Sequence, residues 1–133
     1  MASSEMDTGL RVELVAADRT VWSGEASMVI ARTVEGDVGV LRGHAPMLSL
    51  LTEATVEITT PDGGVVAAVE GGFLSVAGDR VSILSERVLL AEEIQIDEAK
   101  AELDAAHGMP TSDERELRIR RAEARIRAVE KAS

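Results

Sequence analysis

The chain has 133 residues, of which 45% are hydrophobic, and this is enough to build a packed core. Its formal net charge is −10 at pH 7, with 19 acidic and 7 basic side chains in residues 1–112. So acidic a body excludes nucleic acid as a partner, because phosphate backbones are bound through clustered lysines and arginines. The absence of cysteine excludes disulfides and thiolate zinc sites.

The N-terminal segment, residues 1–9, reads MASSEMDTG and is polar and acidic. It has neither the basic nor the apolar region of a signal peptide, and we expect it to be a flexible N-terminus. No apolar run approaches the roughly 20 residues that cross a bilayer, so we expect no direct membrane insertion. A protein of this kind that acts at a membrane is held there by a partner.

Residues 10–90 have the pattern of a β-domain. Apolar and polar residues alternate over residues 10–16 and again over residues 54–58, which indicates half-buried strands. Turn sequences recur between such segments, and the clearest hairpin signal is Pro61-Asp62-Gly63-Gly64. Several short strands with frequent turns predict a sandwich or a small barrel over residues 10–90.

Residues 91–133 change to a helical period. Two apolar sets, each spaced by 3, 4 and 3 residues, predict one stripe on each of two helices: Ile96, Ala99, Leu103 and Ala106, then Ile119, Ala122, Ile126 and Val129. We predict Asp97 as the N-cap of the first helix and a capping box from Thr111 to Glu114 for the second. The short connection predicts an antiparallel hairpin. Because three of these eight residues are alanine, the pairing is thin, and we expect the hairpin to lean on the sandwich, on a partner, or on each in turn.

Side chains suited to catalysis are scarce. His44 and His107 are the only histidines and belong to different regions, so we predict no metal site. No serine lies in a Gly-x-Ser-x-Gly elbow, and no phosphate-binding loop follows the glycines near residue 40, which argues against an enzyme. Arg121 and Arg125 lie one turn apart on the second helix. They form either a solvated basic face or a docking face for a phosphate-bearing ligand or an acidic partner.

Two motifs carry a resemblance to a known family. Residues 36–48 read GDVGVLRGHAPML, and residues 71–76 read GGFLSV. In this order and at this spacing they resemble the epsilon subunit of F-type ATP synthases, whose typical patterns are G-[DE]-[IL]-G-[IV]-L-P-G-H-x-P-L and G-G-F-x-x-V. Arg42 stands where the family pattern has proline. The resemblance covers nearly the whole chain from about Leu10.

The resemblance implies a β-sandwich of about ten strands followed by a C-terminal antiparallel two-helix hairpin. It implies a non-catalytic rotor subunit of the central stalk, which couples proton flow through the c-ring to ATP synthesis at the cytoplasmic face of the cell membrane. The sandwich is expected to grip the gamma subunit. The loop at residues 36–46 is expected at the c-ring end, with Asp37, Arg42 and His44 as contact residues.

The resemblance also implies a regulatory hairpin. In the family the hairpin lies folded on the sandwich, or extends along gamma toward the catalytic alpha and beta subunits and blocks ATP hydrolysis. Some bacterial members bind ATP on the folded hairpin through an I/L-D-x-x-R-A motif, which aligns with residues 96–101, IDEAKA. The implied site comprises Asp97, Lys100, Arg121 and Arg125. No cofactor is required, and we expect regulatory ATP to bind weakly because lysine cannot reproduce a bidentate guanidinium contact.

The alternative hypothesis is a free-standing β-sandwich binding module for a small acidic or sugar ligand, with a small metalloenzyme as the last resort. The low aromatic content, 2%, weighs against sugar binding. A binding module also has no need of a thinly packed helical hairpin. The family resemblance therefore gives the leading hypothesis.

Overall fold

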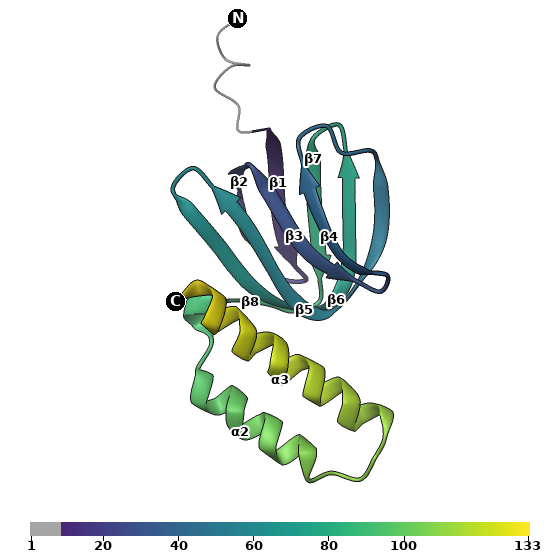
Figure 1. The fold of residues 1–133 in the computed structure, drawn as a ribbon, viewed down its shortest axis with the longest axis vertical. Helices are drawn as coiled ribbons and strands as arrows, with labels where there is room; N and C mark the ends of the chain where they lie inside the picture. Colours follow the sequence, from purple (N-terminus) through teal and green to yellow (C-terminus); the bar gives the residue numbers. More distant parts are fainter. Residues whose placement is uncertain (1–8) are drawn as a thin grey trace, which may run out of the picture.

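The computed structural model describes residues 9–133, so the predicted flexible segment lies outside the described residues except for Gly9. Figure 1 shows a β-sandwich with a pair of helices packed against one end. The strands are β1 (Leu10–Ala16), β2 (Thr20–Ala26), β3 (Met28–Thr33), β4 (Gly36–Leu41), β5 (Met47–Thr60), β6 (Gly63–Ala77), β7 (Arg80–Ser85) and β8 (Val88–Leu90). The predicted sandwich is confirmed, and the small barrel is not formed.

The strand order is β2-β1-β7-β6-β5-β3-β4, and β8 pairs with β6. Neighbouring strands are antiparallel except for the parallel pair β1 and β7. The structure has eight strands, not about ten, because β5 and β6 are long and each runs through both layers. The early part of β6 pairs with β8 and its late part with β7. Counted layer by layer, these two strands supply four segments, which accounts for the larger expected number.

The bend in β6 falls at Gly71 and Gly72, whose φ angles are +72° and +109°. Side chains rarely adopt such angles, and glycine does so without strain. A Cβ at Gly72 would also collide with the carbonyl oxygen of Leu84 on β7. The Gly-Gly-Phe motif thus has a structural cause, since the strand bends where β7 approaches its backbone most closely.

The core between the layers is aliphatic, as the composition predicts. The largest fully buried side chains are Leu14, Ile58, Leu74 and Ile83 with seven valines: Val12, Val29, Val40, Val56, Val69, Val76 and Val81. In β1 the buried and exposed residues alternate, which confirms the period-two pattern of residues 10–16. Trp22 packs against the core from the edge strand β2 and stays partly exposed.

The C-terminal part begins with a short 3₁₀ turn, η1 (Ala91–Glu93), followed by α2 (Ile96–His107) and α3 (Asp113–Ala132). The predicted helical hairpin is confirmed, but both predicted N-caps are displaced. Helix α2 begins at Ile96 after Gln95, which leaves Asp97 in the first turn. The N-cap of α3 is Ser112, not Thr111, and its Oγ accepts a hydrogen bond from the Arg115 backbone at 3.1 Å.

None of the helices within residues 9–133 is long and apolar enough to cross a membrane.

Candidate functional site

Helix α3 forms the contact between the hairpin and the sandwich. It lies between the sandwich and α2 and packs on β5 and β6, as Figure 1 shows. Ala124 and Ala128 are buried against Ala68 and Ala91 on the sandwich side. The predicted stripe that contains Ala122 follows the other side of the helix, where α2 packs. Helix α3 therefore has two apolar faces, of which the one toward the sandwich is built from alanine.

A group of charged side chains, which we call the Glu70 cluster, joins the sandwich to both helices. It consists of Glu70 and Arg87 from the sandwich, Arg121 and Arg125 from α3, and Glu102 from α2. The Nη2 atom of Arg125 lies 2.7 Å from Glu70 Oε2, and its Nη1 atom lies 3.1 Å from Glu102 Oε2. The Arg125 and Glu70 side chains are only 12% and 15% exposed. One guanidinium thus connects a strand and two helices where water screens charge poorly.

Arg121 approaches the same carboxylate from one helical turn away. Its Nε lies 3.3 Å from Glu70 Oε1, yet this buried atom makes no hydrogen bond of acceptable geometry. The contact is therefore mainly Coulombic. Arg87 Nε is farther from the carboxylate, at 3.9 Å. Glu70 consequently faces three guanidinium groups, of which only that of Arg125 donates a hydrogen bond to it.

Further polar contacts fix the position of α3 along the sheet. The buried hydroxyl of Thr55 donates a hydrogen bond of 3.0 Å to the backbone carbonyl of Ala124. Arg120, near the middle of the helix, pairs with Glu53 at 3.5 Å, and Lys131, in its last turn, pairs with Glu57 at 3.6 Å. Exposed pairs of this kind contribute little, typically less than about 1 kcal/mol each. The Thr55 bond and the Glu70 cluster are thus the main polar determinants of docking.

The four residues of the predicted ATP site come from both helices of the hairpin, two from each. Arg121 and Arg125 line a cavity beside the Glu70 cluster, together with Leu117, Arg118 and Met109. Asp97 and Lys100 are exposed near the start of α2. Among residues 9–133, no hydrogen bond or ion pair joins either of them to the two arginines. In this folded hairpin the arginines already bind carboxylates.

The three residues predicted at the c-ring end are also divided. Asp37 is the second residue of β4, and its carboxylate accepts two hydrogen bonds from Arg32, from Nε at 2.9 Å and Nη2 at 3.3 Å. The hydrogen bond from Arg32 is the main reason why the pKa of Asp37 lies below its usual value. Arg42 follows the opposite end of β4, about 16 Å away at 3.3 Å per residue. The neighbour of Asp37 is Arg32, and not Arg42 or His44.

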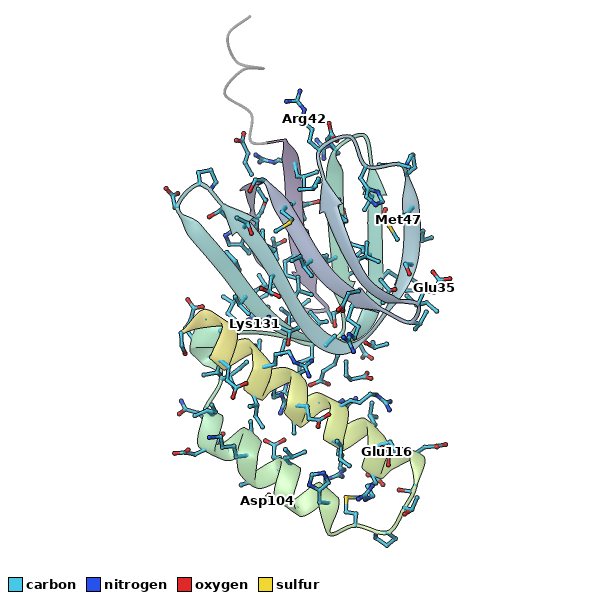
Figure 2. The ribbon with its side chains drawn as sticks, in the orientation of Figure 1. Glu35, Arg42, Met47, Asp104, Glu116 and Lys131 are labelled. Carbon is cyan, nitrogen blue, oxygen red and sulfur yellow. The ribbon has the colours of Figure 1, made fainter. Side chains whose placement is uncertain are left out.

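The loop after β4 does hold Arg42 and His44 together. Figure 2 shows Arg42 at the end of the sandwich farthest from the hairpin. The backbone N–H of His44 donates to the Leu41 carbonyl at 3.1 Å, and its ring Nδ1 lies 2.7 Å from the Ala45 carbonyl. His44 is thus bound within its own loop. The described residues 9–133 contain no group of three or more His, Asp or Glu side chains that could hold a metal ion.

An exposed apolar face is a feature that the sequence interpretation missed. It consists of Leu48 and Leu50 on β5, Phe73 on β6 and Leu84 on β7, which are 73%, 51%, 48% and 46% exposed. Leu50 lies opposite Phe73, and Phe73 lies opposite Leu84, so their side chains share one side of the sheet. Residues 47–51 read MLSLL, and this nearly unbroken apolar run is the signal that the strand carries apolar side chains on its outer face as well as on its core face.

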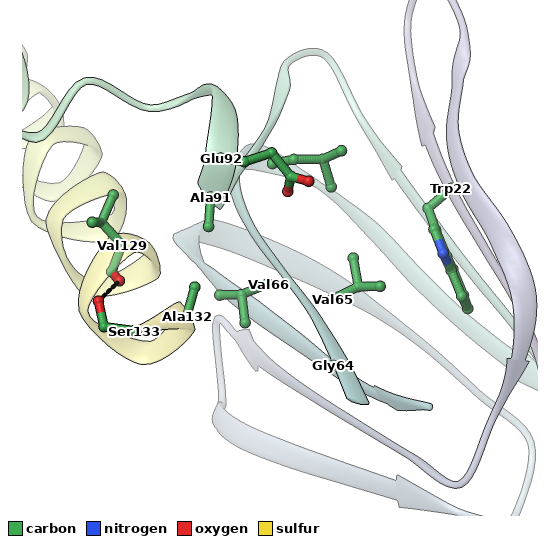
Figure 3. A pocket seen from close by; sticks show the side chains of 10 residues that line it. Trp22, Gly64, Val65, Val66, Ala91, Glu92, Val129, Ala132 and Ser133 are labelled. Carbon is green, nitrogen blue, oxygen red and sulfur yellow. Dashed lines mark hydrogen bonds between the residues drawn. The ribbon is translucent and has the colours of Figure 1, made fainter. Parts of the chain in front are cut away.

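A cleft lies where the last turn of α3 meets the sandwich. Trp22, Val65 and Val66 line it on the sandwich side, and Val129, Ala132 and Ser133 line it on the helix side, as Figure 3 shows. The Ser133 hydroxyl donates to the Val129 carbonyl at 2.9 Å. Since Trp22 is the only tryptophan of the chain, its fluorescence reports on the presence of α3.

Comparisons with known proteins decide the family. The family described as "ATP synthase, Delta/Epsilon chain, beta-sandwich domain" matches residues 9–91. The ATP synthase epsilon chain of Streptomyces griseus is 50% identical over 125 residues, which cover 93% of this chain and 98% of the relative. The chain belongs to the ATP synthase epsilon chains. That of Corynebacterium diphtheriae is 43% identical over 122 residues, covering 90% and 93% of the two chains.

Solved structures share the fold of this epsilon chain. One is a chain of the Euglena gracilis mitochondrial ATP synthase, solved as "OSCP/F1/c-ring", with a TM-score of 0.72 and 24% identity, covering 92% of this chain and 78% of that one. Another, from the Tetrahymena thermophila enzyme and titled "central stalk/cring", has a TM-score of 0.60 and 13% identity over 95% and 97% of the chains. The resemblance inferred from the two motifs is confirmed. This epsilon chain is a non-catalytic subunit of ATP synthase, not a free-standing binding module.

Proposed function

We propose that this epsilon chain is a rotor subunit of the central stalk and that its hairpin regulates ATP hydrolysis by leaving the sandwich. The observation that carries the proposal is the way α3 is docked. Its contact with the sandwich combines small alanine side chains with the Glu70 cluster and few other groups. Such an interface is specific in its position but buries little apolar side-chain surface.

The energetics favour two accessible positions of the hairpin. Burial of a CH₂ group contributes about 0.8 kcal/mol, so contacts between alanine methyl groups add little. The arginines and glutamates regain water when the hairpin leaves, which offsets much of the Coulomb energy of the docked form. The docked and released positions then differ by only a few kcal/mol, which partner subunits can supply. The extended helices would then contact the alpha and beta subunits.

A disulfide that locks the hairpin tests this function in the assembled enzyme. The Thr55 hydroxyl lies 3.0 Å from the backbone carbonyl oxygen of Ala124, so the two residues are neighbours, and the chain has no cysteine of its own. In an assembled enzyme that carries the Thr55→Cys/Ala124→Cys variant, oxidation should lock the hairpin on the sandwich and abolish inhibition of ATP hydrolysis by this subunit. Reduction of the disulfide should restore the inhibition. Each single-cysteine variant is the matched control. Equal inhibition in the oxidised and reduced forms would refute regulation by hairpin release.

We assign the gamma contact to the exposed apolar face. Leu48, Leu50, Phe73 and Leu84 form a continuous apolar surface, and such surfaces on soluble proteins mark interfaces. Aromatic residues at the centre of an interface typically contribute about 2 kcal/mol or more. Phe73→Gln should therefore weaken association with gamma by about 30-fold, whereas Leu41→Gln, which changes an equally exposed leucine outside this face, should not.

The c-ring contact is proposed for the loop after β4, with Arg42 and His44 as the contacting side chains. This loop lies at the end of the sandwich opposite the hairpin. The chain would then be peripheral, held at the cytoplasmic face of the membrane by gamma and the c-ring. Asp37 lies at the other end of β4, so the proposed contact itself consists of Arg42 and His44.

For the hairpin arginines we propose weak regulatory binding of ATP. A triphosphate would compete with Glu70 and Glu102 for Arg125, and Lys100 offers a single ammonium where a guanidinium would bind two oxygens. Calorimetric titration of the isolated chain should show little heat at micromolar ATP. Tight binding that Arg121→Ala abolishes would overturn this expectation and establish a nucleotide site.

A further inference from the structure

Three arginines of the sandwich have no ion-pair partner among residues 9–133. The sandwich holds six arginines, namely Arg11, Arg19, Arg32, Arg42, Arg80 and Arg87. Arg19 pairs with Asp18 and Glu93, Arg32 pairs with Asp37, and Arg87 pairs with Glu70. The other three all line one cleft at the end of the sandwich farthest from the hairpin. We call Arg11, Arg42 and Arg80 the arginine cleft.

The fold brings these three arginines together from distant parts of the sequence. Arg11 and Arg80 are directly paired residues of the parallel strands β1 and β7, so their side chains leave the same side of the sheet. Arg42 comes from the loop after β4, and its Cβ lies over Gly9, so closely that a Cβ at Gly9 would meet it at 2.8 Å. Three positive charges are thus concentrated in an otherwise acidic protein.

Asp79 holds the cleft in shape. It lies in the tight turn between β6 and β7 with a φ of +62°. Its backbone carbonyl accepts a hydrogen bond from the Arg11 N–H at 2.9 Å, and its carboxylate accepts one from the Gly43 N–H at 2.7 Å. This carboxylate therefore binds backbone and makes no ion pair with the arginines. Glu25, the other acid that lines the cleft, is exposed and also makes none within residues 9–133.

We propose that the arginine cleft binds a phosphate group, and that its source is the headgroup of an anionic phospholipid at the membrane surface. Planar guanidinium groups bind phosphate oxygens in pairs, and three of them around one cleft match a compact anion better than an extended surface. Leu41, which directly precedes Arg42, is 56% exposed and supplies an apolar contact next to the charges. The inference rests on the proposed position of the chain beside the membrane.

The overall charge of −10 does not prevent this contact. Charges separated by more than about 8 Å are largely screened at physiological ionic strength, so the local arginines determine the field at this end. Each arginine near an anionic surface strengthens binding by about fivefold. An acidic body on average repels anionic lipid, but at this end three arginines without ion-pair partners within residues 9–133 make the local charge positive.

NMR of the full-length chain with lipid vesicles tests the proposal. Vesicles containing about one phosphatidylglycerol in three lipids should broaden the side-chain N–H signals of the arginine cleft, because each arginine is attracted to an anionic surface, and pure phosphatidylcholine should not. Arg80→Gln should reduce the vesicle affinity about fivefold, while Arg19→Gln, which removes the same charge elsewhere, should leave it unchanged. Asp79→Ala should lower the affinity by disordering the cleft without removing an arginine.

Several results would overturn the proposal. Equal broadening by phosphatidylcholine, whose headgroup has no net charge, would show that an anionic headgroup is not recognised. An equal response to inorganic phosphate at matched concentration would exclude the lipid as the specific source. Association of the unchanged chain with gamma distinguishes the two failures, because its absence would show that the proposed stalk position itself is wrong.

Discussion

The strongest test of the regulatory proposal is the substitution Arg125→Met. Methionine keeps the apolar stem that packs between the helices and removes the guanidinium that connects Glu70 with Glu102. The change therefore addresses the Glu70 cluster and leaves the alanine contacts of α3 in place. We expect the hairpin to leave the sandwich more often, while the sandwich itself stays folded.

The size of the effect follows from the surroundings of Arg125. Loss of one partner of a buried ion pair costs about 3–5 kcal/mol because the other charge stays buried alone. Here Glu70 keeps Arg121 at 3.3 Å and Arg87 at 3.9 Å, and Glu102 is 55% exposed and regains water. We therefore expect a smaller loss of docking free energy, about 2–3 kcal/mol. The ratio of docked to released hairpin should fall by about 30- to 150-fold.

Amide hydrogen exchange measures this ratio directly. A two-helix hairpin of this length is marginal in isolation, so release exposes the α3 amides to exchange. Their exchange should accelerate by about 30- to 150-fold, and the fluorescence of Trp22 should change as the cleft in Figure 3 opens. Arg127→Met is the matched control, because Arg127 is exposed and makes no ion pair within residues 9–133.

Two results would refute the reasoning. Acceleration of the α3 amides by less than about threefold would show that the alanine contacts and Thr55 hold the helix without the Glu70 cluster. Equal acceleration in the strands would show that Arg125 stabilises the whole fold and that the hairpin does not open separately. The Arg127→Met control removes one positive charge as well, so a similar change there would reduce the effect to net charge.

Three further predictions concern other parts of the molecule. Gly72→Ala should destabilise the sandwich by at least about 3 kcal/mol in chemical unfolding, because Gly72 has a positive φ and an added Cβ would collide with β7. Gly39→Ala is the control, because a Cβ there would meet open space, and it should change stability by less than about 0.5 kcal/mol. Arg32→Gln should raise the pKa of Asp37 toward its usual value, as measured by a carbon NMR titration. Since the pKa of Asp37 is lowered in the folded protein, its stabilising effect is present above the unfolded pKa and disappears as the pH falls. The stabilities of the variant and the wild type should therefore converge in acid. Deletion of residues 97–133 should raise the ATPase rate of the assembled enzyme, and an unchanged rate would argue against an inhibitory hairpin.

Much of the architecture is predictable from local pattern. The alternation in residues 10–16 follows from one side of β1 facing the core, and the change of period after residue 90 follows from the two helices. The strand count is less predictable, because a bend within β5 or β6 depends on what packs there and has no period of its own. Gly71 and Gly72 indicate the position of the bend only once β7 is known to lie across it.

Charge pairing is the part that sequence pattern does not predict. Arg125 and Glu70 are 55 residues apart, and nothing local indicates that they meet. Likewise Asp37 is close to Arg42 in sequence, but an extended strand separates them while a hairpin register places Arg32 opposite Asp37. Extended segments move sequence neighbours apart, so a motif that is compact in the sequence need not form one site.

Helix α3 shows how this gap between pattern and structure bears on function. The predicted stripe of Ile119, Ala122, Ile126 and Val129 is recognisable in the sequence because three of its four residues are large and apolar. The buried contact of α3 with the sandwich is instead made by Ala124 and Ala128, with Arg121 and Arg125 beside them, and this set has no apolar period strong enough to predict. A permanent interface would bury larger side chains, since each added CH₂ group contributes about 0.8 kcal/mol. The small alanine side chains on this face therefore explain both why the sequence pattern does not predict it and why its docking is reversible.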